Sequence, residues 1–290
     1  MATPRSIERL EPFPDIAVAL LHRIPSPITQ ISDFCDLLAQ QPQMLSEISQ
    51  VAIHSGRCPE GQTLEAQSLF AIFAPDEITD IAITLLVRSY MRRAFSASED
   101  RRYWRYTLAC AVCCEQVAVM GNQGSLLAYA SGLLHDIGRL ALIATYPDRY
   151  SNLLSLTDRM FAADEPFNIL EHERLLFGMD HFGTGEWVAA AWKLPPWLRP
   201  IVGKFGAQGA GEYTKLVATV RAGTGLAHSL GFGYLQGAPR SDIRKILGHL
   251  PDAWKQWKVL DQWKYGEAHM REKIQSRLNW YGVPPLPEAR

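Results

Sequence analysis

The chain has 290 residues, 47% of them hydrophobic, and a formal net charge of −1 at pH 7. The length allows one large domain or two smaller ones, and the apolar fraction is ordinary for a globular protein. Positive and negative charges nearly cancel, so the chain lacks the basic surplus that drives binding to phosphate backbones. No nucleic-acid partner is expected.

The sequence indicates neither a secretion signal nor a membrane span, because no basic N-terminal segment precedes a short apolar core. The longest uncharged run, residues 116–134, contains Gln, Asn, Ser, Tyr and Gly. It is too polar for a span and predicts two buried helices joined by a turn at residues 121–124. An odd number of cysteines, five, is typical of reduced thiols in a cytoplasmic protein.

The N-terminal third shows helical spacing interrupted by prolines. Residues 1–14 hold three prolines and mixed charges, and we expect a poorly ordered leader or a docking arm there. Helical spacing begins near Asp15 and breaks at residues 24–28, because residues before proline avoid the helical region. Further helices are expected at 29–41, 42–54, 64–73 and from Pro75 onward, with a loop at 55–63.

The remainder of the chain also shows helical spacing, with little strand-like alternation and no internal repeat. The expected helices start near Glu99 and Pro147 and cover 167–177, 186–194, 197–205, 213–230 and a short piece from Ser241-Asp242 to Gly248. Gly231 is the expected C-terminal cap of the long helix at 213–230. The predicted fold class is therefore all-α.

One apolar stretch, residues 132–140, carries an adjacent imidazole and carboxylate, His135 and Asp136. The spacing around them predicts a mostly buried helix that runs through both residues. Neighbouring side chains on a helix point about 100° apart, so the pair needs ligands from other helices to hold an ion. A His-Asp dipeptide alone is a weak signal, and the alternative is a buried pair that neighbouring backbone groups satisfy.

The segment GLLHDIGRLAL, residues 132–142, resembles the central signature of the HD superfamily of metal-dependent phosphohydrolases. It looks most like the HDOD branch, the HD-related output domain of bacterial signalling proteins. The corner at residues 41–45 is similar to the HDOD pattern too, with Gln41 where an acidic residue is usual. The resemblance covers residues 15–235, is most specific over 104–195, and implies an HD-domain-like helical bundle.

The resemblance also implies a metal site, which this sequence retains only in part. His135, Asp136 and His181 stand at ligand positions, and residues 173–181 match a family motif well. Four other positions of the family pattern hold residues that are poor ligands for a divalent metal: Tyr106, Lys204, Phe205 and Thr224. We therefore expect a vestigial site.

Two functions are compatible with this pattern. The first is a non-catalytic signalling module without a cofactor, which binds a signalling protein or a small ligand and could form a homodimer. The second is a phosphohydrolase of nucleotides or cyclic dinucleotides, with Mg, Mn, Fe or Ni at a residual site. Its missing ligands would come from Glu171, His172, Glu173 or Glu186.

Two further clusters of residues have both a functional and a structural interpretation. Arg101, Arg102 and Arg105 could form an anion-binding surface, for instance for a phosphorylated ligand. The favoured alternative is a solvated basic face balanced by nearby acids. An aromatic tail could contact a partner or pack on the domain, and it consists of Trp254, Trp257, Trp263, Trp280 and Tyr281.

We divide the chain into four parts. These are a leader (1–14), an N-terminal helical lobe (15–95), an HD-like helical core (96–235) and a C-terminal helical extension (236–290). The lobe and the core are expected to behave as one unit, because no long linker separates them.

Overall fold

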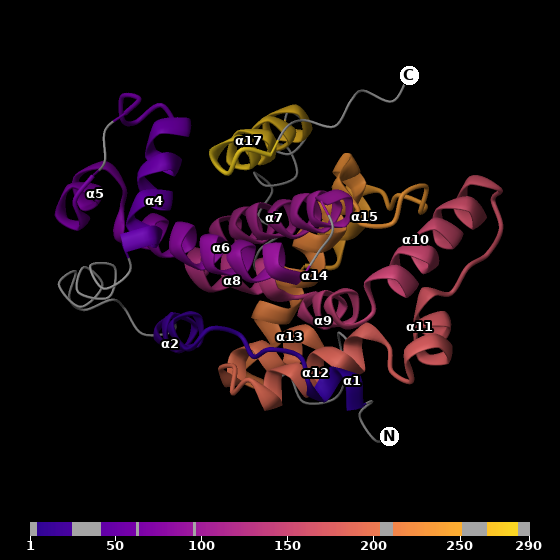
Figure 1. Ribbon diagram of the computed structural model, residues 1–290. Coiled ribbons are helices and arrows are strands. Elements are labelled where there is room, and N and C mark those ends of the chain that lie inside the picture. Colours follow the sequence, from indigo (N-terminus) through magenta and orange to yellow (C-terminus); the bar gives the residue numbers. More distant parts are fainter. Residues whose placement is uncertain are drawn as a thin grey trace.

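A computed structural model describes residues 5–24, 42–61, 64–94, 97–203, 211–250 and 266–283. Within these ranges the regular structure consists of helices, and no strand occurs (Figure 1). The expectation of an all-α protein is confirmed. The expected helix at 29–41, the end of the expected helix at 197–205 and the tryptophans at 254, 257 and 263 lie outside the described residues.

Three helices form the centre of the fold: α7 (Ala97–Met120), α8 (Ser125–Leu134) and α14 (Thr214–Ala227). They pack against one another so closely that small residues are required at the crossings. A Cβ atom on Gly132 of α8 would lie 2.7 Å from the carbonyl oxygen of Cys110 on α7. A Cβ atom on Gly223 of α14 would lie 2.4 Å from the sulfur of Cys114. Each glycine thus sets the distance between two helices.

The connection between α7 and α8 is the turn that the sequence predicts. Helix α7 ends at Met120 and α8 begins at Ser125, so the four intervening residues reverse the chain. Asn122 has a φ of 50°, a left-handed conformation that Asn tolerates better than most residues. The short turn places the two apolar helices next to each other, and each buries much of its surface against the other.

A second layer contains α9 (Ile137–Thr145) and α12 (His181–Ala191), which pack against each other. A Cβ atom on Gly138 would lie 1.9 Å from the carbonyl oxygen of His181, so the two backbones touch at this point. Helices α10 (Pro147–Ala162) and α11 (Ile169–Phe177) extend to one side of this layer (Figure 1). The close contact between α9 and α12 brings the two halves of the predicted site together.

The N-terminal residues that are described do not form a free leader. Helix α1 (Arg5–Glu8) packs against α9, and Ile7 is completely buried. The ring of Phe13 stacks on Trp192 with centroids 6.0 Å apart. The expectation of a poorly ordered leader is therefore corrected for residues 5–14, because these apolar side chains are buried in the core.

The described part of the N-terminal lobe contains the helices α2 (Asp15–Arg23), α4 (Pro42–His54), α5 (Ala66–Ile72) and α6 (Pro75–Ala94). As predicted, α4 and α6 both begin at a proline. Proline has no backbone N–H, and the first N–H groups of a helix have no partner within the helix, so no hydrogen bond is lost. Helix α6 contacts α2, α4, α5, α7, α8 and α9. The lobe therefore packs on the core through α6.

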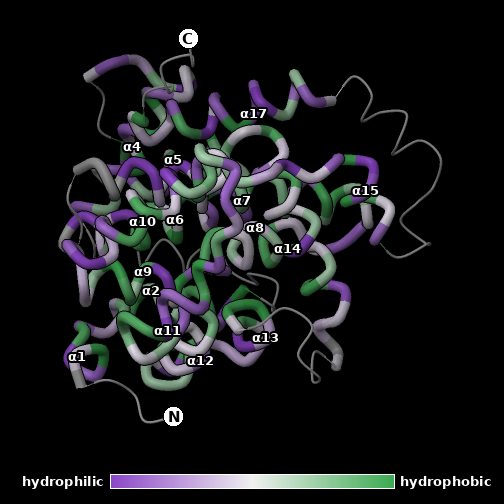
Figure 2. Tube along the Cα trace, turned by 90° about the vertical axis from the view of Figure 1, so that its right-hand side faces the viewer, coloured by the Kyte–Doolittle hydropathy of each residue, from purple (hydrophilic) through white to green (hydrophobic). Residues whose placement is uncertain are grey.

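The C-terminal helix α17 (Gly266–Trp280) lies against α4 and α7 and so spans both parts. Its hydropathy alternates along the tube in Figure 2. On its inner side Arg277 is buried, with Nη2 3.9 Å from a carboxylate oxygen of Glu115. Trp280 accepts a hydrogen bond from His54 through its carbonyl oxygen, and Arg57 lies over its ring. Trp280 and Tyr281 are thus placed in intramolecular packing.

Several element ends differ from the sequence expectation. Helix α12 begins at His181, five residues before the predicted start, because Asp180 caps it by accepting a hydrogen bond from the backbone N–H of Gly183. The stretch after Pro195 forms two short pieces, η1 (Pro196–Leu198) and α13 (Arg199–Val202). The helix predicted at 213–230 is shorter in the structure, where α14 covers Thr214–Ala227. The short turn η2 (Gly211–Tyr213) precedes it and the π-helical turn η3 (His228–Phe232) follows it. Gly231 has the expected positive φ, 91°.

Two other predicted features are clear in the structure. Asp242 caps α15 (Ile243–Gly248) by accepting from the backbone N–H groups of Arg244 and Lys245. The described ranges contain one stretch long and apolar enough to cross a membrane, Ser125–Thr145, and 94% of its most apolar window is buried inside the fold. Such burial is typical of a core helix pair.

We predict that Gly132→Ala lowers the free energy of unfolding by about 1–3 kcal/mol, the usual range for an overpacked core. The added methyl group meets the backbone of α7, which cannot move aside as a flexible side chain would. Urea unfolding measures the change.

Gly248→Ala is the matched control, because nothing lies within 4 Å of a Cβ atom there. Its effect should stay within about 0.5 kcal/mol. Equal losses in the two variants would contradict a specific α7–α8 contact.

Candidate functional site

His135 and Asp136 lie at a break between two helices, which corrects the prediction of one continuous helix. Helix α8 ends at Leu134 and α9 begins at Ile137. Asp136 occupies the N-cap position of α9 with φ −107° and ψ 27°, yet its side chain makes no capping hydrogen bond. The carboxylate instead binds a side chain of the following turn. The break therefore turns both residues into the space between helices.

The imidazole of His135 is buried and bonded on both nitrogens. Its Nδ1 lies 2.8 Å from the carbonyl oxygen of Gly132, so Nδ1 carries the proton and donates. The hydroxyl of Tyr106 lies 2.9 Å from Nε2 and donates to it. Burial lowers the pKa of His135, and this outweighs the opposing charge of Asp136. The ring is therefore neutral near pH 7.

Glu173 of α11 is a fully buried carboxylate that holds the start of α12. Its Oε2 accepts from the backbone N–H of His181 at 2.9 Å and from Nδ1 of the same residue at 2.6 Å. Its Oε1 accepts from the hydroxyl of Tyr150 at 2.6 Å. Burial raises the pKa of Glu173, but its interactions with His181, then with Arg139 and Tyr150, lower it more, to about 2.

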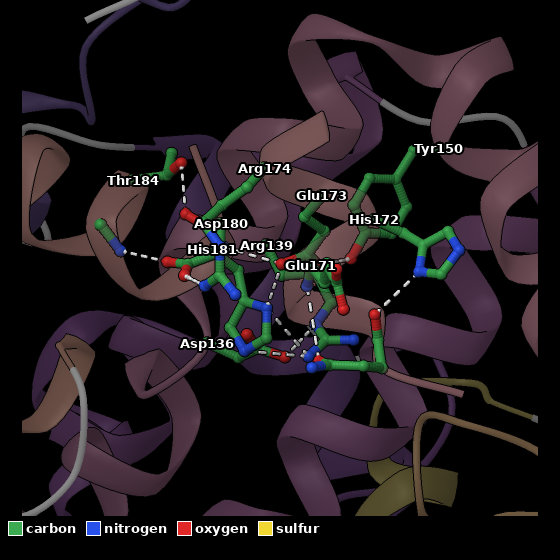
Figure 3. Close-up of polar contacts among 12 residues, drawn as sticks. Asp136, Arg139, Tyr150, Glu171, His172, Glu173, Arg174, Asp180, His181 and Thr184 are labelled. Atoms are coloured by element: carbon green, nitrogen blue, oxygen red, sulfur yellow. Dashed lines mark hydrogen bonds and ion pairs between the residues drawn. The ribbon is translucent and has the colours of Figure 1, made fainter. Parts of the chain in front are cut away.

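The guanidinium group of Arg139 lies between Asp136 and His181 (Figure 3). Its Nε is 2.7 Å from Oδ2 of Asp136, and its Nη2 is 3.2 Å from Nε2 of His181. The group also lies over the ring of Tyr234, with 4.7 Å from Cζ to the ring centroid. Arg139 is only 7% exposed, so it is an internal cation held by residues of several helices.

These residues do not fit a divalent metal. In metal sites a histidine donates its outer N–H to a carboxylate or carbonyl and binds the metal with the other nitrogen. His135 and His181 retain the outer contacts, but each Nε2 already accepts from a protein donor, Tyr106 or Arg139. The charge of Arg139 also repels a cation. Within the described ranges no group of three or more His, Cys, Asp and Glu residues could hold a metal ion.

The structure brings together only some of the residues that the sequence selects. His135, Asp136, His181 and Tyr106 form one cluster, whereas Thr224 bonds to the carbonyl oxygen of Arg221 in its own helix. Lys204 and Phe205 lie outside the described residues. For the alternative ligands, Glu171 is exposed and His172 bonds to the backbone of Asn168. Glu186 is exposed as well.

Sequence reasoning missed the central role of Arg139 and the supporting tyrosines. Tyr103 donates to the backbone carbonyl of Asp136 at 2.7 Å, and Tyr150 holds Glu173. The available signal was the spacing of three residues between Asp136 and Arg139, which puts their side chains on the same side of a helical turn.

The three arginines near residue 100 do not share one free surface. Arg102 makes a bidentate ion pair with Asp158 at 2.7 and 2.8 Å, and its Nε donates to the carbonyl oxygen of Tyr234. The guanidinium of Arg105 lies over the ring of Phe232, 4.8 Å from the centroid. Arg101 is exposed and lies in the first turns of α7. Arg102 is therefore structural, and Arg105 has a separate environment.

Comparison with known proteins identifies the family. Residues 10–204 match the model of the HDOD domain. An HDOD domain protein of unknown function from Geobacter sulfurreducens has a similar structure, with a TM-score of 0.71, 16% identity and 93% of both chains covered. No curated protein sequence matches the chain significantly.

Two other solved structures share the fold. One, from Shewanella amazonensis SB2B, is named as a candidate phosphohydrolase and has a TM-score of 0.63, 17% identity and 97% of both chains covered. The other, from Marinobacter aquaeolei VT8, is named as a candidate signal transduction protein. Its TM-score is 0.67 at 18% identity. The match covers 94% of this chain and 64% of the Marinobacter chain.

We predict that Glu173→Gln destabilises the protein at pH 7 and flattens its response to acid. The folded pKa of Glu173, about 2, lies below the ordinary value of 4.5. Its contribution, on the order of 3 kcal/mol, is complete above pH 4.5 and is lost as the pH falls toward 2. Urea unfolding between pH 7 and pH 3 should show the two proteins converging.

Glu171→Gln serves as the control, because Glu171 is on the same helix but exposed. Its stability should stay within about 0.5 kcal/mol of the parent at every pH. A constant difference between Glu173→Gln and the parent from pH 7 to pH 3 would contradict the ionised state of Glu173.

Proposed function

Because this chain belongs to the HDOD family, we propose that it is a non-catalytic signal-transduction module that acts by binding. One observation carries the proposal: the side chain of Arg139 stands where the His-Asp pair and His181 would otherwise face a metal. A partner of this module would be a signalling protein or a small ligand.

The chemistry of phosphate ester hydrolysis explains why this substitution matters. A divalent metal activates water and neutralises charge on the phosphate, and it needs several free electron pairs from the protein. Here Asp136 is paired with Arg139, and both Nε2 atoms accept hydrogen bonds. A guanidinium group neutralises charge but does not lower the pKa of a bound water as a metal does. The cluster can therefore stabilise the fold without activating a nucleophile.

The same contacts suit a module that transmits binding through helix packing. The cluster joins α7 through Tyr106, the α8–α9 break through His135 and Asp136, and the α11–α12 pair through Glu173 and His181. Buried polar networks of this kind act as a unit, since breaking one bond leaves its partner unsatisfied. A ligand that shifts one of these helices would change the energy of the others.

The alternative is a residual metal-dependent phosphohydrolase acting on a nucleotide or cyclic dinucleotide. It is favoured by the retained outer contacts of the two histidines, which orient Nε2 as in a metal site. In this alternative the cofactor would be Mg, Mn, Fe or Ni, and Arg139 would have to leave the site first.

Metal analysis of the purified protein separates the two functions. We expect less than 0.1 metal ion per chain and no hydrolysis of nucleotides or cyclic dinucleotides above background with added Mn. Stoichiometric metal that disappears in His135→Ala, together with Mn-dependent hydrolysis, would overturn the non-catalytic proposal.

A gain-of-function variant tests the role of Arg139 directly. In Tyr106→His/Arg139→Gln the internal cation is gone and a further imidazole faces the cluster, so Asp136 and His181 become available as ligands. We expect 1 mM Mn or Ni to raise the melting temperature of this variant and to leave the parent unchanged. An equal response of both proteins would mean that Arg139 does not block the site.

A further inference from the structure

Three arginines from separate parts of the chain approach the π-helical turn η3 (His228–Phe232). Arg105 comes from α7, Arg240 from the segment before α15, and Arg271 from α17. The turn is held against that segment by two hydrogen bonds, from Ser229 to the carbonyl of Ser241 and between His228 and the carbonyl of Pro239. These side-chain-to-backbone hydrogen bonds hold the segment that carries Arg240 beside the turn.

The three guanidinium groups each lie near one of two adjacent residues of the turn, Gly231 and Phe232. That of Arg105 lies over the ring of Phe232, 4.8 Å from the centroid. A Cβ atom built on Gly231 would lie 3.4 Å from Nη1 of Arg271 and 3.5 Å from Nη2 of Arg240, so these two groups lie side by side. Arg271 also donates to the carbonyl oxygen of Leu230, which fixes its position.

Within the described ranges, no carboxylate balances these charges. Among the described residues, none of Arg105, Arg240 and Arg271 has an acidic oxygen within 4 Å, whereas Arg57, Arg102, Arg139, Arg174 and Arg277 all do. Arginines held near one another without an anion repel, and the repulsion is strongest where water is excluded.

Water is partly excluded at Arg105. Its Nε and Nη1 atoms are closed off from solvent and have no hydrogen-bond partner in the described part of the chain. The same burial lowers the pKa of Arg105. A buried donor without a partner and a desolvated cation without a counter-charge both cost free energy. Arg105 is thus a partly desolvated cation with unsatisfied donors, whereas Arg240 and Arg271 are exposed. An anion bound at the turn would supply the partner that Arg105 lacks among the described residues.

We propose that Arg105, Arg240 and Arg271 form an anion site at η3 that binds the phosphate groups of a small phosphorylated ligand. Planar guanidinium groups match phosphate oxygens with paired hydrogen bonds, and three of them suit a group with several charges. Of the three arginines that the sequence suggested for an anion site, only Arg105 belongs to the proposed site. The other two members are Arg240 and Arg271. This inference deepens the proposed function and rests on it, because it supplies a ligand class for the module.

The position of the site allows a bound ligand to influence the polar cluster around His135 through helix α7. Arg105 directly precedes Tyr106, whose hydroxyl holds His135. A ligand bound to Arg105 and Arg271 also joins α7 to the C-terminal helix α17. Binding therefore stabilises the docked position of α17 and changes the end of α7 that carries Tyr106.

Titration calorimetry with inorganic pyrophosphate tests the site, in a buffer free of phosphate and sulfate and with ionic strength held constant by KCl. We expect saturable binding by the parent and at least tenfold weaker binding by Arg105→Met and by Arg240→Gln. Arg149→Gln is the matched control, because Arg149 is an exposed arginine on α10, and it should bind like the parent. Citrate should bind at least tenfold more weakly than pyrophosphate.

The melting temperature without ligand shows whether a variant has simply failed to fold. Arg105→Met keeps the apolar contact with Phe232 and removes the uncompensated charge, so its melting temperature should equal or exceed that of the parent. The inference is overturned if the parent shows no saturable binding. It is also overturned if Arg105→Met and Arg149→Gln bind pyrophosphate equally, or if citrate binds as tightly as pyrophosphate. These outcomes leave the proposed function intact, which only bound metal and Mn-dependent hydrolysis overturn.

Discussion

The contact of Arg139 with Asp136 and His181 is the interaction on which the rest of this structure depends. A buried carboxylate next to two histidines needs a positive partner, and in this chain the protein supplies that partner from its own helix α9. The result is a buried set of hydrogen bonds and ion pairs that links α9, α11 and α12. Loss of the guanidinium would leave Asp136 as an uncompensated buried charge.

Close helix packing makes this arrangement possible. Gly138 lets α9 touch the backbone of α12 at His181, and Gly132 lets α8 touch α7 near Cys110. Because the backbones of α9 and α12 are that near, the side chain of Arg139 on α9 reaches the ring of His181 on α12. The break after Leu134 then turns His135 toward Tyr106 and Asp136 toward Arg139. The polar contacts of the cluster therefore depend on the close packing of these helices.

The chain treats its arginines in two different ways. Arg139, Arg102 and Arg277 are paired with carboxylates and hold helices together. Arg105, Arg240 and Arg271 form a second group, which lies near the turn η3 and has no acidic oxygen within 4 Å among the described residues. The first group suits a scaffold, and the second suits recognition of an anion. Recognition of a ligand needs a rigid frame around the binding residues, so the two groups are complementary.

Much of this protein follows from local sequence alone. Helical spacing, the turn at residues 121–124 and the cap at Asp242 act through neighbours in the chain, and they predicted the all-α class. The signature at 132–142 predicted the HDOD family. Only the tertiary structure decided that Ile7 is buried and that Arg139 fills the cluster. Arg139 and His181 are 42 residues apart, and periodicity carries no information about contacts at that distance.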